Sequence, residues 1–126
     1  MGSAGKTRGI ALDTNVLLGI ESLKINPFEE IRMELGNSAR IVMPLEVKKE
    51  LEKRGIKKGP AKTAKAVIES EKPEIVETKA KNADDALLEL AKNGFFVATN
   101  DRALRKKIKQ GNGTVVFLRK KGIEIY

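Results

Sequence analysis

Residues 8–18 read Arg-Gly-Ile-Ala-Leu-Asp-Thr-Asn-Val-Leu-Leu, a short apolar run that ends at an acid. The run over 8–12 is mostly apolar and brief, which favours a buried strand. Asp13 and the two polar residues after it are helix-capping types, and apolar residues follow from Val16 to Ile20. The segment therefore predicts a strand that passes directly into a helix, with a carboxylate at the junction.

The rest of the chain repeats this alternation of short apolar strands and helices, with Pro or Gly at most boundaries. The expected strands cover residues 40–43, 74–77, 95–99, 114–118 and 123–126, and the expected further helices cover 27–35, 44–54, 59–70, 82–91 and 101–109. Such alternation predicts parallel strand pairing with helices on both faces of the sheet. We therefore expect one three-layer α/β/α domain over residues 8–126, preceded by a flexible segment over residues 1–7.

The composition restricts the available chemistry. The 126 residues include no Cys and no His. Disulfides, thiolate zinc sites, Ser-His-Asp triads and imidazole acid–base catalysis are therefore excluded. No apolar run approaches the roughly 18 to 20 residues that cross a bilayer, so we expect a cytoplasmic protein without a membrane partner. An enzyme of this composition must use carboxylates, hydroxyls, Lys or Arg.

The net charge is +8, and the basic residues are clustered. Eight lie within 48–65 against two acids, and eight more lie within 102–121 with no acid. A solubilising or heat-adapted surface explains such charge, but clustering favours a nucleic-acid partner, because Lys and Arg release counterions from phosphates. The residues expected to bind RNA are Lys57, Lys58, Lys62, Arg102 and Arg105.

Several acids lie near predicted strand ends, the edge where ligands bind in open α/β sheets. Asp13 and Asp101 follow strands, while Asp84 and Asp85 open a helix. Glu50 lies within the helix expected over 44–54. Each has an ordinary alternative role, because Asp commonly caps helices and a helical Glu can pair with a Lys or Arg one turn away.

Taken together, these acids indicate a metal site. A basic chain without His or Cys has few other uses for carboxylates at strand ends. Mg²⁺ prefers hard oxygen ligands and keeps several waters, so a loose group of three or four carboxylates suits it. Two such ions about 3.5 to 4 Å apart can activate water and stabilise the leaving oxygen when a phosphodiester is cleaved.

Four segments resemble, in order, the motifs of PIN-domain nucleases, and the resemblance spans residues 9 to about 118. They are Leu-Asp-Thr-Asn-Val-Leu (12–17), Lys-Glu-Leu-Glu-Lys (49–53), Ala-Asp-Asp-Ala-Leu-Leu (83–88) and Ala-Thr-Asn-Asp-Arg-Ala-Leu (98–104). The resemblance implies a PIN-like sandwich fold and a Mg²⁺-dependent endoribonuclease, with Mn²⁺ able to substitute.

The resemblance also implies roles for particular residues. The acidic, catalytic pocket would comprise Asp13, Glu50, Asp85 and Asp101. Asp84 competes with Asp85 for the third position, and Asp-Ala-Leu-Leu matches the family pattern better from Asp85, so Asp84 would add a ligand or a cap. Asn15 and Thr99 would orient the carboxylates.

Two branches of the family fit these motifs. One is the VapC-type toxin, which an antitoxin neutralises. The other processes ribosomal RNA alongside ribosome-assembly factors. Its motifs, of the form Glu-Leu-Glu-Lys and Ala-Asp-Asp, look closer to those of this chain. PIN domains are often dimers, so a homodimer is also expected by analogy.

Two alternatives belong to other functional classes. A non-catalytic RNA-binding scaffold with this fold would be expected to lack the acids, and they are present. A phosphotransferase with Asp13 as nucleophile needs a second acid two residues later, where this chain has Asn15.

Overall fold

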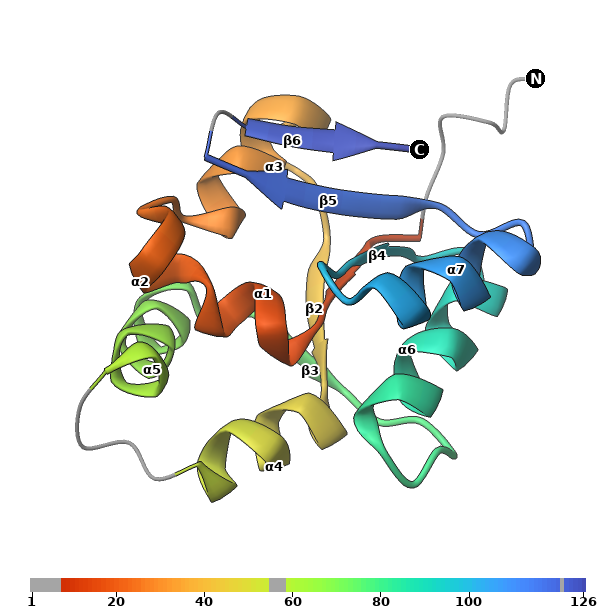
Figure 1. Ribbon diagram of the computed structural model, residues 1–126, viewed down its shortest axis with the longest axis horizontal. Coiled ribbons are helices and arrows are strands. Elements are labelled where there is room, and N and C mark those ends of the chain that lie inside the picture. The colour runs from red at the N-terminus through yellow and green to blue at the C-terminus, as the bar shows by residue number, and fades with distance from the viewer. Residues whose placement is uncertain (1–7, 55–58, 121) are drawn as a thin grey trace.

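The computed structural model describes residues 8–54, 59–120 and 122–126. Within them, six strands form one sheet in the order β3-β2-β1-β4-β5-β6 (Figure 1). The strands are β1 (Ile10–Leu12), β2 (Ile41–Pro44), β3 (Glu74–Val76), β4 (Phe96–Ala98), β5 (Val115–Arg119) and β6 (Gly122–Ile125). Every neighbouring pair is parallel except β5 and β6. The prediction of a mostly parallel α/β sheet is confirmed.

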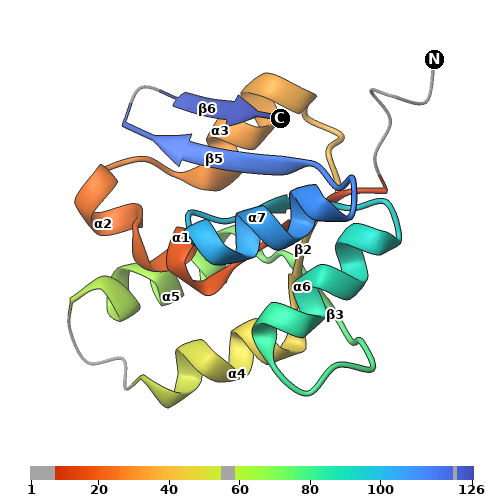
Figure 2. The same ribbon diagram turned by 45° about the vertical axis from the view of Figure 1, so that its right-hand side comes forward.

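Helices cover both faces of this sheet. They are α1 (Thr14–Leu18), α2 (Ile20–Leu23), α3 (Pro27–Leu35), α4 (Leu45–Lys53), α5 (Pro60–Glu71), α6 (Ala83–Lys92) and α7 (Arg102–Gln110). Figure 1 shows α6 and α7 on one side of the sheet and α1, α2 and α5 on the other. The turned view of Figure 2 shows α4 at one end of the molecule, and α4 contacts both α1 and α6.

The one antiparallel pair has a simple cause. Only two residues separate β5 from β6, whereas a parallel connection needs a dozen or more residues for its crossover. Gly122 has a φ of +127°, a conformation that L side chains rarely adopt, and it begins β6 after the turn. The last strand therefore folds back along β5 as a hairpin.

The helix expected after Asp13 is divided in the structure. The first part ends at Leu18 and the second begins at Ile20, with Gly19 between them. The amide of Gly19 donates to the carbonyl of Asn15, 2.9 Å away, and thereby closes the first part. The segment over residues 1–7, which was expected to be flexible, lies outside the described residues.

The core is built around the central strand β1. Ile10, Ala11 and Leu12 are fully buried between β2 and β4, as the apolar run predicts. Leu17 packs into the core from α1 and Leu87 from α6, on the opposite side of the sheet. Full burial of one such leucine contributes roughly 1.5–3 kcal/mol, so β1 is held firmly in place.

No helix within the described residues is long and apolar enough to cross a membrane.

Candidate active site

Asp13 lies where β1 passes into α1. Strands β1 and β4 are parallel neighbours with Leu12 opposite Ala98, so the residues after them meet at the carboxyl edge of the sheet. The amide of Asp13 donates to the carbonyl of Ala98 at 3.0 Å. The Asp13 carboxylate caps α1, because its Oδ1 accepts from the Thr14 amide at 2.7 Å. Asp13 is only 5% exposed, so a charged group is held inside the fold.

Thr99 connects two of the acids. Its hydroxyl, which is fully buried, donates to Asp13 Oδ2 at 2.6 Å. The same Oγ1 accepts from the amide of Asp101 at 3.0 Å. Asp101 in turn caps α7, because its Oδ1 accepts from the Leu104 amide at 2.9 Å. One threonine hydroxyl therefore ties the end of β1 to the start of α7.

The two asparagines near this bridge hold the backbone rather than the carboxylates. Asn15 Oδ1 accepts from the amide of Asn100 at 3.1 Å, which joins α1 to the loop before α7. The Asn100 side chain pairs with Leu118 of β5 in both directions, at 3.3 Å and 3.2 Å. Asn100 did not emerge from the sequence reasoning. Its only signal was its position between Thr99 and Asp101, because an amide pairing with a strand backbone depends on tertiary placement.

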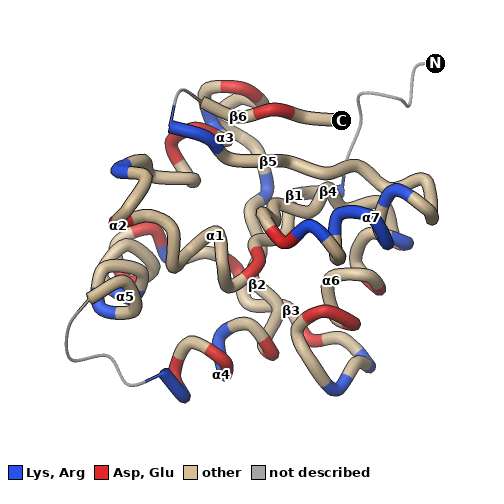
Figure 3. The backbone as a smooth tube through the Cα atoms, in the orientation of Figure 1, with Lys and Arg blue, Asp and Glu red and all other residues tan. Residues whose placement is uncertain are grey.

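Glu50 reaches the site from α4. This helix buries Val47 and Leu51 against the core, which leaves the half-buried Glu50 beside the apolar face. Glu50 interacts electrostatically with both Asp13 and Asp84. Figure 3 shows acidic segments at the end of β1, on α4, and at the starts of α6 and α7, around one edge of the sheet. Acids from four elements therefore lie within electrostatic range of one another at this edge of the sheet.

Both adjacent acids at the start of α6 line the hollow that contains Glu50, and Asp84 is the one that acts on the pKa of Asp13. Asp84 interacts electrostatically with Asp101, Glu50 and Asp13. Asp85 instead belongs to the helix cap, because its Oδ2 accepts from Asn82 Nδ2 at 3.1 Å and its amide donates to Asn82 Oδ1 at 2.9 Å. The motif favours Asp85 for the third position, and in the structure Asp84 is the neighbour that acts on the pKa of Asp13.

Two acids of the group have raised pKa values. Burial raises the pKa of Asp13, and the like charges of Asp84 and Glu50 add to this, whereas hydrogen bonds from Thr99 and Thr14 oppose it. The pKa of Asp84 is raised mainly because surrounding atoms desolvate its carboxylate. Asp84 is nevertheless an exposed residue. Repulsion from Asp101 is the second cause. Like charges are thus held together at a cost that a cation would relieve.

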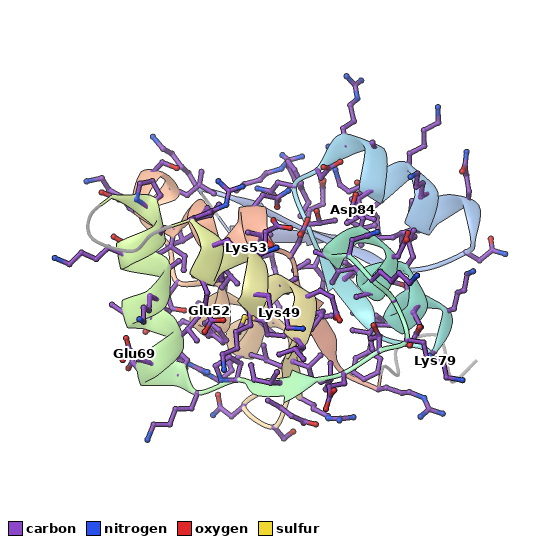
Figure 4. The ribbon with its side chains drawn as sticks, turned by 90° about the horizontal axis from the view of Figure 1, so that it is seen from below. Lys49, Glu52, Lys53, Glu69, Lys79 and Asp84 are labelled. Carbon is purple, nitrogen blue, oxygen red and sulfur yellow. The ribbon has the colours of Figure 1, made fainter. Side chains whose placement is uncertain are left out.

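Lysines surround the acids. A hollow of about 470 Å³ is lined by Glu50, by both Asp84 and Asp85, and by Lys107, and Lys107 opposes the rise in the pKa of Asp84. A second hollow shares Glu50 and is lined by Lys49 and Lys53 among others. Figure 4 shows Asp84 on the same side of the molecule as these two lysines of α4. The acidic edge therefore has a basic rim.

The residues expected to bind RNA are placed differently from one another. Lys57 and Lys58 lie outside the described residues. Lys62 is exposed on α5 and is absent from the walls of the two hollows that contain Glu50. Arg102 is exposed at the start of α7, next to Asp101. Arg105 is absent from the walls of these two hollows, and its guanidinium lies 4.4 Å from the centre of the Phe117 ring.

The donor set fits a hydrated divalent cation. Within residues 8–54, 59–120 and 122–126, no three acidic side chains are close enough together to ligate one ion directly. Mg²⁺ keeps several of its waters and needs only one or two direct carboxylates. Two buried oxygens near the acids, Thr14 Oγ1 and Glu46 Oε1, have no hydrogen-bond partner among the described residues. A bound cation would favour the charged form of the carboxylates, and its waters would supply hydrogen-bond partners for these two oxygens.

Several named proteins resemble this chain over nearly its whole length. The chain is 35% identical over 127 residues to Ribonuclease VapC4 of Methanocaldococcus jannaschii, covering 93% of this chain and 95% of that protein. It is 36% identical over 124 residues to Ribonuclease VapC9 of Archaeoglobus fulgidus, covering 94% and 88%. The structure of the PIN domain endonuclease Utp24 matches with a TM-score of 0.79 at 25% identity, over 93% of this chain and 90% of that one. The family model described as "PIN like domain" matches residues 10–121, and the chain therefore belongs to the PIN-like domain family.

Proposed function

We propose that the protein is a divalent-metal-dependent endoribonuclease. The observation that carries this proposal is the electrostatically coupled group of Asp13, Glu50, Asp84 and Asp101, which come from four elements and meet at the carboxyl edge of the sheet. The similarity to proteins named ribonucleases over nearly the whole chain supports the same activity.

The acids have distinct tasks in this proposal. Asp13, Asp84 and Asp101 would hold Mg²⁺ or Mn²⁺ together with Glu50, and Asp85 would serve mainly as part of the α6 cap. When bound, such ions activate water and stabilise the leaving oxygen of a phosphodiester. Thr99 fixes the orientation of Asp13 through the 2.6 Å hydrogen bond, as groups behind metal ligands commonly do.

The basic rim holds the substrate. Carboxylates alone repel a phosphate backbone, so nearby cations must offset their charge. Lys49 and Lys53 on α4, Lys81 before α6 and Lys107 on α7 line the hollows that contain Glu50. We propose that these four lysines bind the phosphates on either side of the scissile bond.

The experiment that tests the activity uses a circular RNA, which has no ends for an exonuclease to enter. Purified protein is incubated with the circle in Mg²⁺, in Mn²⁺ or in EDTA, and the products are separated by length. We expect linear fragments with either ion and intact circles in EDTA. Binding without cleavage under all three conditions would contradict the proposal and indicate an RNA-binding scaffold.

For the biological role we propose a VapC-type ribonuclease with an antitoxin partner, because both relatives with that name match at 35–36% identity. A role in ribosomal RNA processing is the alternative, and it draws on the motif resemblance over residues 49–53 and 83–88. Induced expression in a bacterial host separates the two roles. If the protein is a VapC-type toxin, expression of the wild type should arrest growth of the host, and expression of Asp13→Asn should not. Unimpaired growth with active enzyme would favour the processing role.

A further inference from the structure

Five side chains outside the acidic group form a chain of cation–aromatic contacts, which we call the cation–aromatic ladder. It comprises Arg119, Phe117, Arg105, Tyr126 and Lys109. Two guanidinium groups lie over the Phe117 ring, at 4.4 Å for Arg105 and 5.4 Å for Arg119. The amine of Lys109 lies 5.5 Å from the centre of the Tyr126 ring. Arg105 links the two rings, because its Nη1 donates to the Tyr126 hydroxyl at 2.9 Å.

The strand pairing sets the spacing of the two rings. Tyr126 exchanges two backbone hydrogen bonds with Val115, at 2.7 Å and 3.0 Å, so it continues the β5–β6 hairpin. Phe117 lies two residues along β5 from Val115, and alternate residues of a strand face the same side. Both rings therefore face α7, the helix that supplies Arg105 and Lys109.

The ladder is accessible and strongly positive. Tyr126 is 41% exposed, and the Arg119 side chain is 59% exposed. Glu124 is the acid that pairs with the ladder, at 3.0 Å from Arg119, so at most one of the three positive charges is offset by an ion pair among the described residues. Lys106 adds a further exposed cation on α7. Figure 3 shows basic segments along this helix.

The ladder is continuous with the candidate active site. Helix α7 begins directly after Asp101, one of the acids of the site. At the other side, Leu118 is hydrogen bonded to the side chain of Asn100, and Arg119 follows it. Helix α7 and the Leu118–Arg119 end of β5 therefore connect the ladder to the loop that carries Asp101.

We propose that the cation–aromatic ladder binds a single-stranded RNA segment beyond the scissile bond, with a base stacked on Tyr126 and phosphates on Lys109 and Arg119. Single-stranded nucleic acids are bound by aromatic rings for the bases and basic side chains for the backbone, and this face supplies both in alternation. The choice of RNA over other single-stranded nucleic acids rests on the proposed function. The inference that this surface stacks a base does not depend on that function.

The composition provides a direct probe. Tyr126 is the only tyrosine of the chain and there is no tryptophan, so the intrinsic tyrosine emission comes from the ladder alone. A 12-nucleotide single-stranded RNA is titrated in EDTA, with correction for its absorbance. We expect binding to quench the emission, because the base stacks on the ring. Inorganic polyphosphate, which has charge but no bases, should bind without comparable quenching.

Variants test the same point by affinity. Tyr126→Ala should weaken RNA binding by about fivefold or more, because one base stack is lost. Tyr126→Phe retains the ring and should stay within about twofold of wild type. Ile75→Ala is the matched control, since Ile75 is 38% exposed on β3 at the opposite edge of the sheet. Arg119→Ala should flatten the salt dependence of log affinity by roughly 0.7 per lost phosphate contact.

Two results would overturn the ladder as a binding surface: wild-type affinity in folded Tyr126→Ala, or equal quenching by polyphosphate and RNA. Folding of each variant is checked by circular dichroism. Because EDTA prevents metal-dependent cleavage, these measurements do not depend on catalysis. Quenching by RNA in a protein that cuts no circle would keep the ladder and reject the nuclease. Cleavage of the circle by a protein whose RNA affinity is unchanged in Tyr126→Ala would keep the nuclease and reject the ladder.

Discussion

The replacement Thr99→Val removes the hydroxyl that joins Asp13 to the Asp101 loop while it preserves the size of a fully buried side chain. Two hydrogen bonds disappear, the 2.6 Å bond to the Asp13 carboxylate and the 3.0 Å bond from the Asp101 amide. A hydrogen bond to a charged group contributes roughly 1.5–3 kcal/mol and a neutral one about 0.5–1.5 kcal/mol. The free energy of unfolding should therefore fall by about 2–4 kcal/mol, which lowers Tm by on the order of 10 °C.

Thr99→Ser is the matched control, because it keeps the hydroxyl and loses one methyl group, a cost of about 1 kcal/mol. Urea unfolding at pH 7 measures both variants against wild type. The effect of Thr99→Val should also shrink on acidification, since the lost bond favours the charged form of Asp13, and that form disappears as pH falls through its pKa. In an Asp13→Asn background the same change should cost less. If Thr99→Val and Thr99→Ser unfold within about 0.5 kcal/mol of each other, the hydroxyl bridge does not hold the site.

Three further predictions concern the acids and their rim. Asp84→Asn should reduce RNA cleavage far more than Asp85→Asn, and steady-state kinetics with the two variants decide this; equal losses would return Asp85 to the third position. The pKa values of Asp13 and Asp84 are raised in the folded state, so the folded protein binds protons more readily than the unfolded chain. The contribution of these two groups to the free energy of unfolding is therefore greatest below about pH 3.8, the ordinary pKa of an aspartate, and is lost as the pH rises through their folded-state pKa values. Mg²⁺ should therefore raise Tm at pH 7 and have little effect in acid, and a pH-independent Mg²⁺ shift in differential scanning fluorimetry would argue against these carboxylates as the ligands. Replacing Lys49 and Lys53 with Ala should flatten the slope of log RNA affinity against log salt by roughly 1.4, at 0.7 per contact, while an unchanged slope would move the RNA path off α4.

Much of the architecture was accessible from the sequence because local signals and tertiary packing agree. The apolar runs at β1 and β4 are short and uninterrupted, as strands buried on both faces must be, and Pro or Gly marks most helix boundaries. The antiparallel β6 was not foreseen, although the short link before Gly122 excludes a parallel crossover. The break at Gly19 was missed because the apolar pattern continues through it.

The site was only partly accessible for a physical reason. Motif order identifies which segments supply acids, but the direction of a side chain in a first helical turn depends on the cap. Asn82 donates to Asp85, whereas Asp84 is the neighbour that acts on the pKa of Asp13, and the motif, which favours Asp85, does not show this difference. The sequence predicts that Arg105 binds RNA because it lies in an acid-free run, but it does not predict the contact with Phe117. Its packing against Phe117 depends on a hairpin formed by the last residues of the chain.

The most direct test of the account is the cleavage rate of one RNA at limiting Mg²⁺, measured for wild type and for Asp13→Asn. Asparagine can still cap α1 through its side-chain oxygen, but it removes the charge that would hold the ion. We expect the variant to stay folded and to lose more than about 100-fold in rate, since changes that merely orient a metal ligand already cost 10–100-fold. Cleavage by folded Asp13→Asn at a rate close to wild type would contradict the assignment of the carboxylate group as the catalytic centre.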